Sequence, residues 1–128
     1  MAKILILETD RVLAGNLRQY LRNSGHKAIW SATPQTAIEA TDQQSPDVIV
    51  MDLLLGGHSG VEFLYELRSY PEWQNLPVII LSSLSSRNVQ NPSTSLEQLN
   101  ITQFFYKPDT KLNQVAAAVD MAVQPTKA

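Results

Sequence analysis

Short, wholly apolar runs alternate with longer amphipathic stretches along this chain, and this alternation is what most constrains its fold. Ile4–Leu7 and Val78–Leu81 are continuous apolar runs, 47–52 is a third, and 26–32 and 101–106 also have strand-like composition. Strands that are apolar on both sides belong to a parallel sheet covered by helices on both faces. The pattern therefore predicts an α/β fold around a five-stranded parallel sheet.

The stretches between these strands carry the start and stop signals of helices. Asp10 is a plausible N-cap for a first helix, and Gly25 suits the left-handed position that ends it. Pro34 opens a second helix that runs to about residue 42. Further helices are expected at 60–70 and 112–123. Five strand–helix units in this length match a doubly wound, flavodoxin-like (βα)5 architecture with strand order 2-1-3-4-5.

Length and charge place the chain among ordinary globular domains. Its 128 residues suffice for one domain, which we assign to 1–128 with a core of about 3–123. A net charge of −2 creates no general field that attracts nucleic acid or an anionic membrane. The absence of cysteine excludes disulfides and thiolate chemistry. Since no apolar run approaches a membrane span and no signal peptide precedes the first strand, we expect a cytoplasmic protein without membrane or nucleic-acid partners.

Asp52 stands at the carboxyl end of the third strand, where a lone acid is costly to bury. A strand-end aspartate can simply cap the next loop, but the other strand ends also carry chemistry-bearing residues. Glu8-Thr9-Asp10 follows the first strand, Ser82 the fourth and Lys107 the fifth. Carboxylates, a hydroxyl and an ammonium at one sheet edge suit a hard cation such as Mg²⁺ beside a carboxylate that attacks phosphorus.

These residues carry a resemblance to a known family. The acidic cluster after the first strand, Asp52 with Gly60 eight residues later, 77–82, and Lys107-Pro108 occur in the order and spacing of receiver domains. The chain resembles a response-regulator receiver domain of the single-domain chemotaxis-regulator type, from Lys3 to about Val123.

The resemblance implies a role for each matching position. Asp52 resembles the phosphoacceptor, Lys107 the lysine that binds the phosphoryl group, and Ser82 the switch hydroxyl. Phe104 resembles the switch aromatic. The Mg²⁺ ligands that the resemblance implies are Glu8, Asp52, the backbone carbonyl of Leu54 and, as a further candidate, Asp10. A histidine kinase or phosphotransfer protein would supply the phosphoryl group, so the chain accepts it rather than acting as an enzyme.

Two positions depart from the family pattern. Thr9 stands where receivers carry the aspartate that ligates Mg²⁺ directly, so we expect weak Mg²⁺ binding, with Glu8 or Asp10 compensating. The loss of a charge-assisted contact corresponds to roughly 1.5–3 kcal/mol. Gly56 stands where receivers usually carry proline, and together with Gly57 it predicts a more flexible loop.

Three functions compete at this stage. The first is a working receiver that switches a protein-binding surface formed by the last helices and the strand 101–106. The second is a pseudo-receiver that binds a partner without phosphorylation, because Thr9 replaces the metal-ligating aspartate. The third, a flavoprotein on the same fold, is disfavoured because the carboxylates of Glu8 and Asp10 would repel a cofactor phosphate.

The remaining assignments are structural. His26 and His58 are expected to be solvated surface residues, and Trp30 and Trp73 to be packing residues. Phe104 and its neighbours 105–106 are expected to show ordinary strand burial. Residues 82–100 are rich in serine and predict a long loop followed by a short helix.

Overall fold

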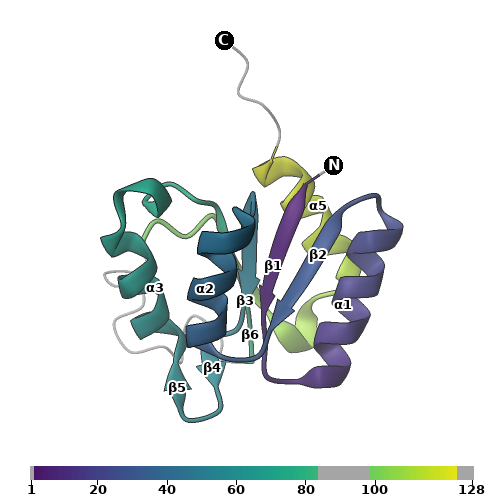
Figure 1. Cartoon of the computed structure of the whole chain (residues 1–128). Helices are drawn as coiled ribbons and strands as arrows, with labels where there is room; N and C mark the ends of the chain where they lie inside the picture. Colours follow the sequence, from purple (N-terminus) through teal and green to yellow (C-terminus); the bar gives the residue numbers. More distant parts are fainter. Residues whose placement is uncertain (1, 84–98, 124–128) are drawn as a thin grey trace.

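A parallel sheet forms the centre of the molecule (Figure 1). The computed structural model describes residues 2–83 and 99–123. The five strands of the sheet lie in the order β2-β1-β3-β6-β7, and every neighbouring pair is parallel. Their bounds are as follows: β1 Lys3–Leu7, β2 Lys27–Ser31, β3 Val48–Met51, β6 Val78–Ser82 and β7 Gln103–Tyr106. Counted along the five strands this is the order 2-1-3-4-5, so the predicted fold is confirmed.

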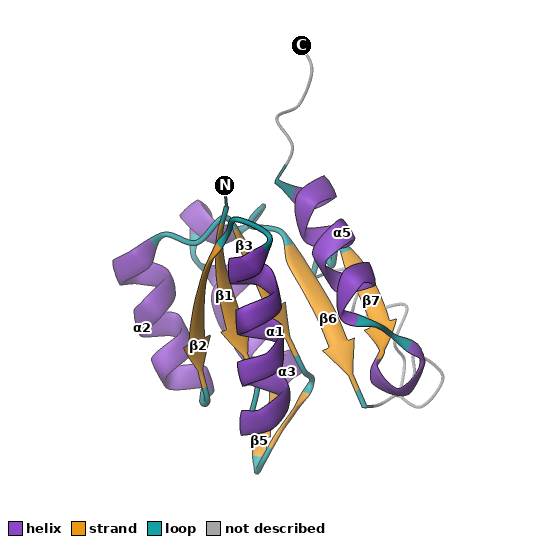
Figure 2. Ribbon diagram, turned by 90° about the vertical axis from the view of Figure 1, so that its right-hand side faces the viewer, coloured by secondary structure: helices purple, strands orange, loops and turns teal. Residues whose placement is uncertain are grey.

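Helices cover both faces of the sheet (Figure 2). The helices are α1 Arg11–Asn23, α2 Pro34–Gln44, α3 Gly60–Ser69 and α5 Leu112–Ala122, and single 3₁₀ turns occupy Pro71–Trp73 and Lys107–Asp109. One core contains buried side chains of α1, α5 and the even-numbered positions of β1, while the other contains those of α3 and the odd-numbered positions. Because strand side chains alternate between faces, a single apolar strand supplies both cores. None of the helices among the described residues has the length and apolar character needed to cross a membrane.

Local signals at the helix ends act as predicted. The Asp10 carboxylate accepts hydrogen bonds from the backbone N–H groups of Val12 and Leu13 and so caps α1. Gly25 has φ +92° directly after that helix, and Pro34 occupies the first turn of α2. Helix α2 extends to Gln44, two residues beyond the predicted end, because Ser45 rather than Asp42 takes the left-handed conformation.

A small hairpin between β3 and α3 is absent from the predicted elements. Strand β4 (Leu54–Leu55) pairs antiparallel with β5 (His58–Ser59). Gly56 and Gly57, which join them, have φ values of +49° and +86°. Proline is fixed near φ −65° and cannot occupy such a position. Gly56 therefore belongs to a tight turn that proline could not form, and the segment expected to be a loop contains a hairpin.

The last strand is shorter and more exposed than expected. Strand β7 begins at Gln103 rather than Ile101, and as an edge strand it leaves Tyr106 37% exposed, while Phe104 and Phe105 are half-buried. The expectation of ordinary burial is therefore wrong for Tyr106. Most of the predicted loop and short helix at 82–100 lies outside the described residues.

His26 corrects a further prediction. Its side chain is only 9% exposed, and it lies between the chain start and the last helix. Nδ1 accepts a hydrogen bond from the Ala2 backbone N–H at 3.0 Å, and Nε2 lies 2.7 Å from the Asp120 carboxylate of α5. The imidazole therefore joins β1, β2 and α5 instead of standing in solvent.

Candidate functional site

Three of the predicted side chains meet at the carboxyl edge of the sheet. Lys107, directly after β7, places its Nζ 2.6 Å from the Asp52 carboxylate and 2.8 Å from the Glu8 carboxylate. Glu8 follows β1 and Asp52 follows β3, so the chain brings them together only through the parallel sheet. Both carboxylates are nearly inaccessible, with side-chain exposures of 6% and 3%. The cost of burying Asp52 is therefore offset by the Lys107 ammonium, which it shares with Glu8.

The pKa of Lys107 reflects this arrangement. Partial burial acts to lower it, but the hydrogen bonds that Lys107 donates to Asp52 and Glu8, together with their negative charges, outweigh burial, so the pKa is raised above its ordinary value. The lysine therefore stays protonated throughout the physiological range. Its stabilising contribution is complete below the pKa of an unfolded lysine and is lost only as the pH rises through the raised value of the folded protein.

Each acid is also held by the backbone around it. Asp52 Oδ1 accepts a hydrogen bond from the Leu54 N–H at 3.0 Å, and Glu8 Oε2 accepts one from the Asp10 N–H at 3.1 Å. The second oxygen of each carboxylate contacts Lys107. Leu54 itself is 47% exposed, so the segment after Asp52 borders solvent. The carboxylate of Asp52 is thus fixed in position next to an open rim.

Gly60 lets the start of α3 pack against this segment. Its N–H donates to the Leu53 carbonyl at 2.9 Å, and a Cβ at this position would lie 2.7 Å from Leu53 Cα and 2.9 Å from the Asp52 carbonyl oxygen. Both contacts are with backbone, which cannot rotate away as a flexible side chain would. The glycine eight residues after Asp52 is therefore required by a close backbone approach.

A Gly60→Ala substitution is expected to lower the free energy of unfolding by about 1–3 kcal/mol, as overpacking of a tight contact does. Gly15→Ala is the matched control, because a Cβ there meets nothing within 4 Å and alanine favours a helix by up to about 1 kcal/mol. Urea denaturation measures both. Equal stability of Gly60→Ala and the parent protein would contradict the close packing.

The two departures from the family pattern lie beside each other. Thr9 is exposed, and its Cγ2 would lie 3.8 Å from a Cβ placed on Gly56. Asp10, proposed as a substitute metal ligand, uses its Oδ1 to cap α1, so serving a metal with that oxygen would compete with the cap. Among residues 2–83 and 99–123, no three histidine, cysteine, aspartate or glutamate side chains gather in a way that could hold a metal ion.

Trp30 belongs to the site although the sequence suggested only packing. Its indole Nε1–H donates to the Glu8 carbonyl at 2.8 Å, and the Glu8 N–H donates to the carbonyl of Ser31 at 3.2 Å. Both contacts come from β2, the neighbour of β1. The backbone of Glu8 is therefore held from β2, while its carboxylate contacts Lys107.

The two candidate switch residues lie on adjacent strands. Ser82 ends β6 and is fully buried, and its register partner on β7 is Tyr106. Phe104 is half-buried, is paired with Ile80 and packs against the core on the α2–α3 face. Ser82 thus lies at the carboxyl edge of the sheet, whereas Phe104 lies within β7, three residues before Lys107.

A Lys107→Met substitution is expected to lower the free energy of unfolding by about 2–3 kcal/mol, because it leaves two buried carboxylates without their shared cation. The double variant Lys107→Met, Asp52→Asn is expected to recover part of this loss. A double-mutant cycle by chemical denaturation gives the coupling energy. Strictly additive effects would show that Lys107 does not neutralise Asp52.

Comparison with known proteins agrees with this geometry. Residues 4–120 match the family described as the response regulator receiver domain. Protein RcaC of Microchaete diplosiphon is 35% identical over 89 residues, 70% of this chain and 14% of that protein. The KDP operon transcriptional regulatory protein KdpE of Escherichia coli is 32% identical over 88 residues, 69% of this chain and 38% of that protein. The chain therefore corresponds to only part of these relatives.

Solved receiver structures share the fold at low sequence identity. The non-phosphorylated HemR receiver domain from Leptospira biflexa superposes with a TM-score of 0.84 at 21% identity, over 100% of this chain and 98% of that one. The BeF3-activated receiver domain of Klebsiella pneumoniae RstA gives 0.81 at 24% identity, over 96% and 99%. With the strand order, the joined acids and lysine, and the family match over 4–120, the chain belongs to the response regulator receiver domain family of two-component signalling.

Proposed function

We propose that this domain accepts a phosphoryl group on Asp52 from a histidine kinase or phosphotransfer protein. The main support for this proposal is that Lys107 contacts both the Asp52 and Glu8 carboxylates at the carboxyl edge of the sheet, next to the exposed Leu54. One Asp52 oxygen accepts a hydrogen bond from the Leu54 N–H and the other accepts one from Lys107 Nζ, so the lysine lies directly beside the carboxylate that would accept the group.

The chemistry is a transfer between two covalent carriers. A carboxylate oxygen of Asp52 forms a bond to phosphorus as the bond between phosphorus and the donor's imidazole nitrogen breaks, and the donor regains a neutral histidine with a proton from solvent. Lys107, already cationic, is placed to bind an oxygen of the transferred group. The domain thus stores the group, and we do not expect it to turn over a substrate as an enzyme does.

Members of this family generally bind Mg²⁺ at the phosphorylation site. Two buried carboxylates that converge on one cation, with the Leu54 carbonyl nearby in the chain, form a donor set that fits a divalent ion, although Thr9 supplies no charge. Glu8, Asp52 and the Leu54 carbonyl would hold it. When bound, the ion supplies charge neutralisation on the phosphoryl oxygens. We infer weak binding.

The output is a change of a protein-binding surface. New charge at Asp52 biases Ser82 and Phe104 between two arrangements, and this reshapes the face formed by β7 and α5. Since the chain covers only part of its relatives, which include transcriptional regulators, the target it serves is part of this proposal: a cytoplasmic protein rather than DNA or a membrane.

Beryllofluoride, which forms a phosphoryl-like adduct on a carboxylate, tests the switch. Added with Mg²⁺, it should shift the backbone amide NMR signals of Ser82 and Phe104 as well as those around Asp52. Shifts confined to the neighbourhood of Asp52 would contradict a switch.

A pseudo-receiver is the second candidate, and Thr9 is the observation that favours it. In this version Lys107 remains the permanent counter-ion of Glu8 and Asp52, and the domain binds its partner in one state. The two candidates differ in whether Asp52 can be phosphorylated at all.

A further inference from the structure

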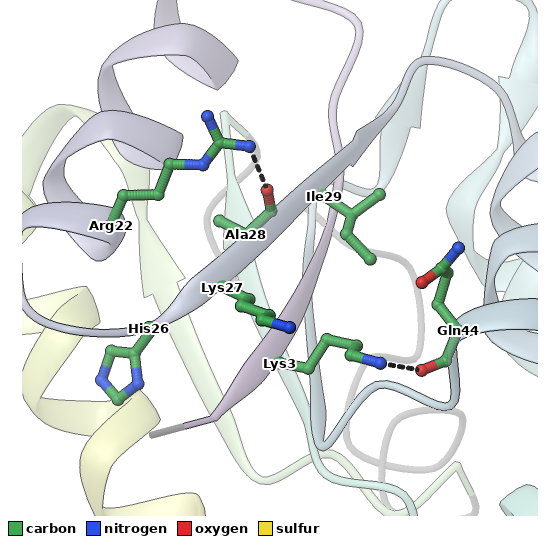
Figure 3. Close-up of a pocket in the computed structure, with 7 residues that line it drawn as sticks. All are labelled: Lys3, Arg22, His26, Lys27, Ala28, Ile29 and Gln44. Atoms are coloured by element: carbon green, nitrogen blue, oxygen red, sulfur yellow. Dashed lines mark hydrogen bonds between the residues drawn. The ribbon is translucent and has the colours of Figure 1, made fainter.

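A second polar site lies at the amino edge of the sheet, opposite Asp52. A pocket of about 380 Å³ follows the start of the edge strand β2 (Figure 3). Its lining consists of seven residues: Lys3, Arg22, His26, Lys27, Ala28, Ile29 and Gln44. Three of the seven carry a permanent positive charge and none is acidic, in a chain whose net charge is −2. The receiver mechanism uses none of them.

Two of these cations are direct neighbours across the sheet. Lys3 of β1 and Lys27 of β2 are register partners, and Figure 3 shows both side chains on the same side of the strands. Like charges at directly opposite positions destabilise a sheet. An anion bound between the two ammonium groups would offset this repulsion.

The hydrogen bonds of these cations leave donors unused. Lys3 Nζ donates to the Gln44 carbonyl at 2.7 Å, at the carboxyl end of α2, where a cation is favoured. Arg22 Nη2 donates to the Ala28 carbonyl at 3.3 Å. A guanidinium group has five N–H donors, and this is the one hydrogen bond that the Arg22 side chain makes to the described residues. The backbone N–H of Lys27 donates to the Ala2 carbonyl at 2.8 Å, but within the described part of the chain its ammonium group makes no hydrogen bond or ion pair. Lys3 contacts the carboxyl end of α2, and Arg22 lies in the last turn of α1, where positive charge is favoured. Lys27 has no such helix end to interact with.

Two acids contact residues of the pocket without pairing with its cations. Asp47 accepts a hydrogen bond from the Lys3 backbone N–H, and Asp120 contacts His26. Neither forms an ion pair with Lys3, Arg22 or Lys27 in the described structure. The positive charge of the pocket is therefore left for a ligand.

We propose that this pocket binds a small phosphate-bearing molecule. Lys3 and Lys27 bind phosphate oxygens as point charges, and Arg22 offers its planar group from α1 at the other side of β2. Ala28 and Ile29 provide an apolar wall, and the volume lies in the range of small-ligand sites. Because this edge is remote from Asp52, such a ligand would bind whether or not the domain accepts a phosphoryl group.

Inorganic pyrophosphate and ATP are the probes. Each is titrated into the ¹⁵N-labelled protein in phosphate-free buffer at low salt without added metal. We expect saturable shifts of the amide signals of Lys27, Ala28 and Ile29. Lys27→Gln should weaken binding about tenfold or more, the loss of one charge-assisted contact. Lys27 is exposed, so the variant should keep the amide spectrum of the folded protein.

Lys111→Gln is the matched control, since it removes one exposed positive charge at the start of α5, outside the pocket. It should leave the affinity unchanged. Equal weakening by both variants, shifts confined to residues around Asp52, or no shifts at all would overturn the proposal. A phosphate could also belong to a lipid headgroup, and sedimentation with phosphatidylglycerol vesicles tests this source. Binding to vesicles without binding of pyrophosphate or ATP would also overturn the proposal of a small-molecule ligand.

Discussion

An Asp52→Asn variant is expected to take up no phosphoryl group from a small-molecule donor such as acetyl phosphate. Asparagine has nearly the same shape and keeps an oxygen for the Leu54 N–H, but its amide is not a nucleophile toward phosphorus. The substitution removes only one of the two negative charges that contact Lys107. Glu8 still pairs with the lysine, so the variant should fold. Intact-mass spectrometry distinguishes an adduct from its absence.

Asp47→Asn provides the control for this experiment. Asp47 precedes β3 and Asp52 follows it, so the two acids stand at opposite ends of one strand. Asp47 is exposed, and its carboxylate contacts only the Lys3 N–H among the described residues. The control variant should be phosphorylated like the parent protein. An adduct that persists in Asp52→Asn would place the acceptor on another residue.

The second large effect concerns the metal. A Thr9→Asp substitution should tighten Mg²⁺ binding about tenfold to a hundredfold, because it adds a charged oxygen ligand beside Glu8 and Asp52, worth roughly 1.5–3 kcal/mol. Thr9 is exposed, so the longer acidic side chain has room. Trp30 donates to the Glu8 carbonyl and offers a fluorescence signal for the titration.

Thr9→Asn separates charge from size, since it adds a neutral oxygen of similar length. It should improve Mg²⁺ affinity far less than aspartate does. Unchanged or weaker binding in Thr9→Asp would show that residue 9 does not lie at the metal.

The sequence was sufficient for the fold and for the residues that meet at the site. Apolar runs such as Val78–Leu81 are short and follow loop residues, which favours strands buried on both faces, and parallel strands bring their carboxyl ends to one edge. Glu8, Asp52 and Lys107 are far apart in the chain, yet their places after three strands are enough to predict their contact. The capping role of Asp10 followed from local chemistry alone.

Other features depend on contacts that no local pattern encodes. His26 contacts Ala2 and Asp120, and Trp30 reaches the Glu8 backbone across the sheet. Arg68 of α3 donates to the carbonyls of Trp73, Leu99 and Asn100, while burial lowers its pKa. A lone histidine, tryptophan or arginine on a helix has the same appearance in sequence whether it is solvated or holds two segments together.

The β4–β5 hairpin was hidden for another reason. Its strands have two residues each, too few to show alternation. The glycine pair at 56–57 carried the signal, because a Gly-Gly dipeptide favours a two-residue hairpin turn. The prediction of a loop at this position did not include that turn.

The most direct test of the account is whether the unaltered protein is phosphorylated in a Mg²⁺-dependent way. The protein is incubated with acetyl phosphate over a series of Mg²⁺ concentrations and analysed by intact-mass spectrometry. A receiver with a weak metal site should give a single phosphoryl adduct that appears only at high Mg²⁺ concentration, and at lower Mg²⁺ concentration in Thr9→Asp. No adduct at any Mg²⁺ concentration in the unaltered protein, with Thr9→Asp gaining one, would contradict it and identify a pseudo-receiver.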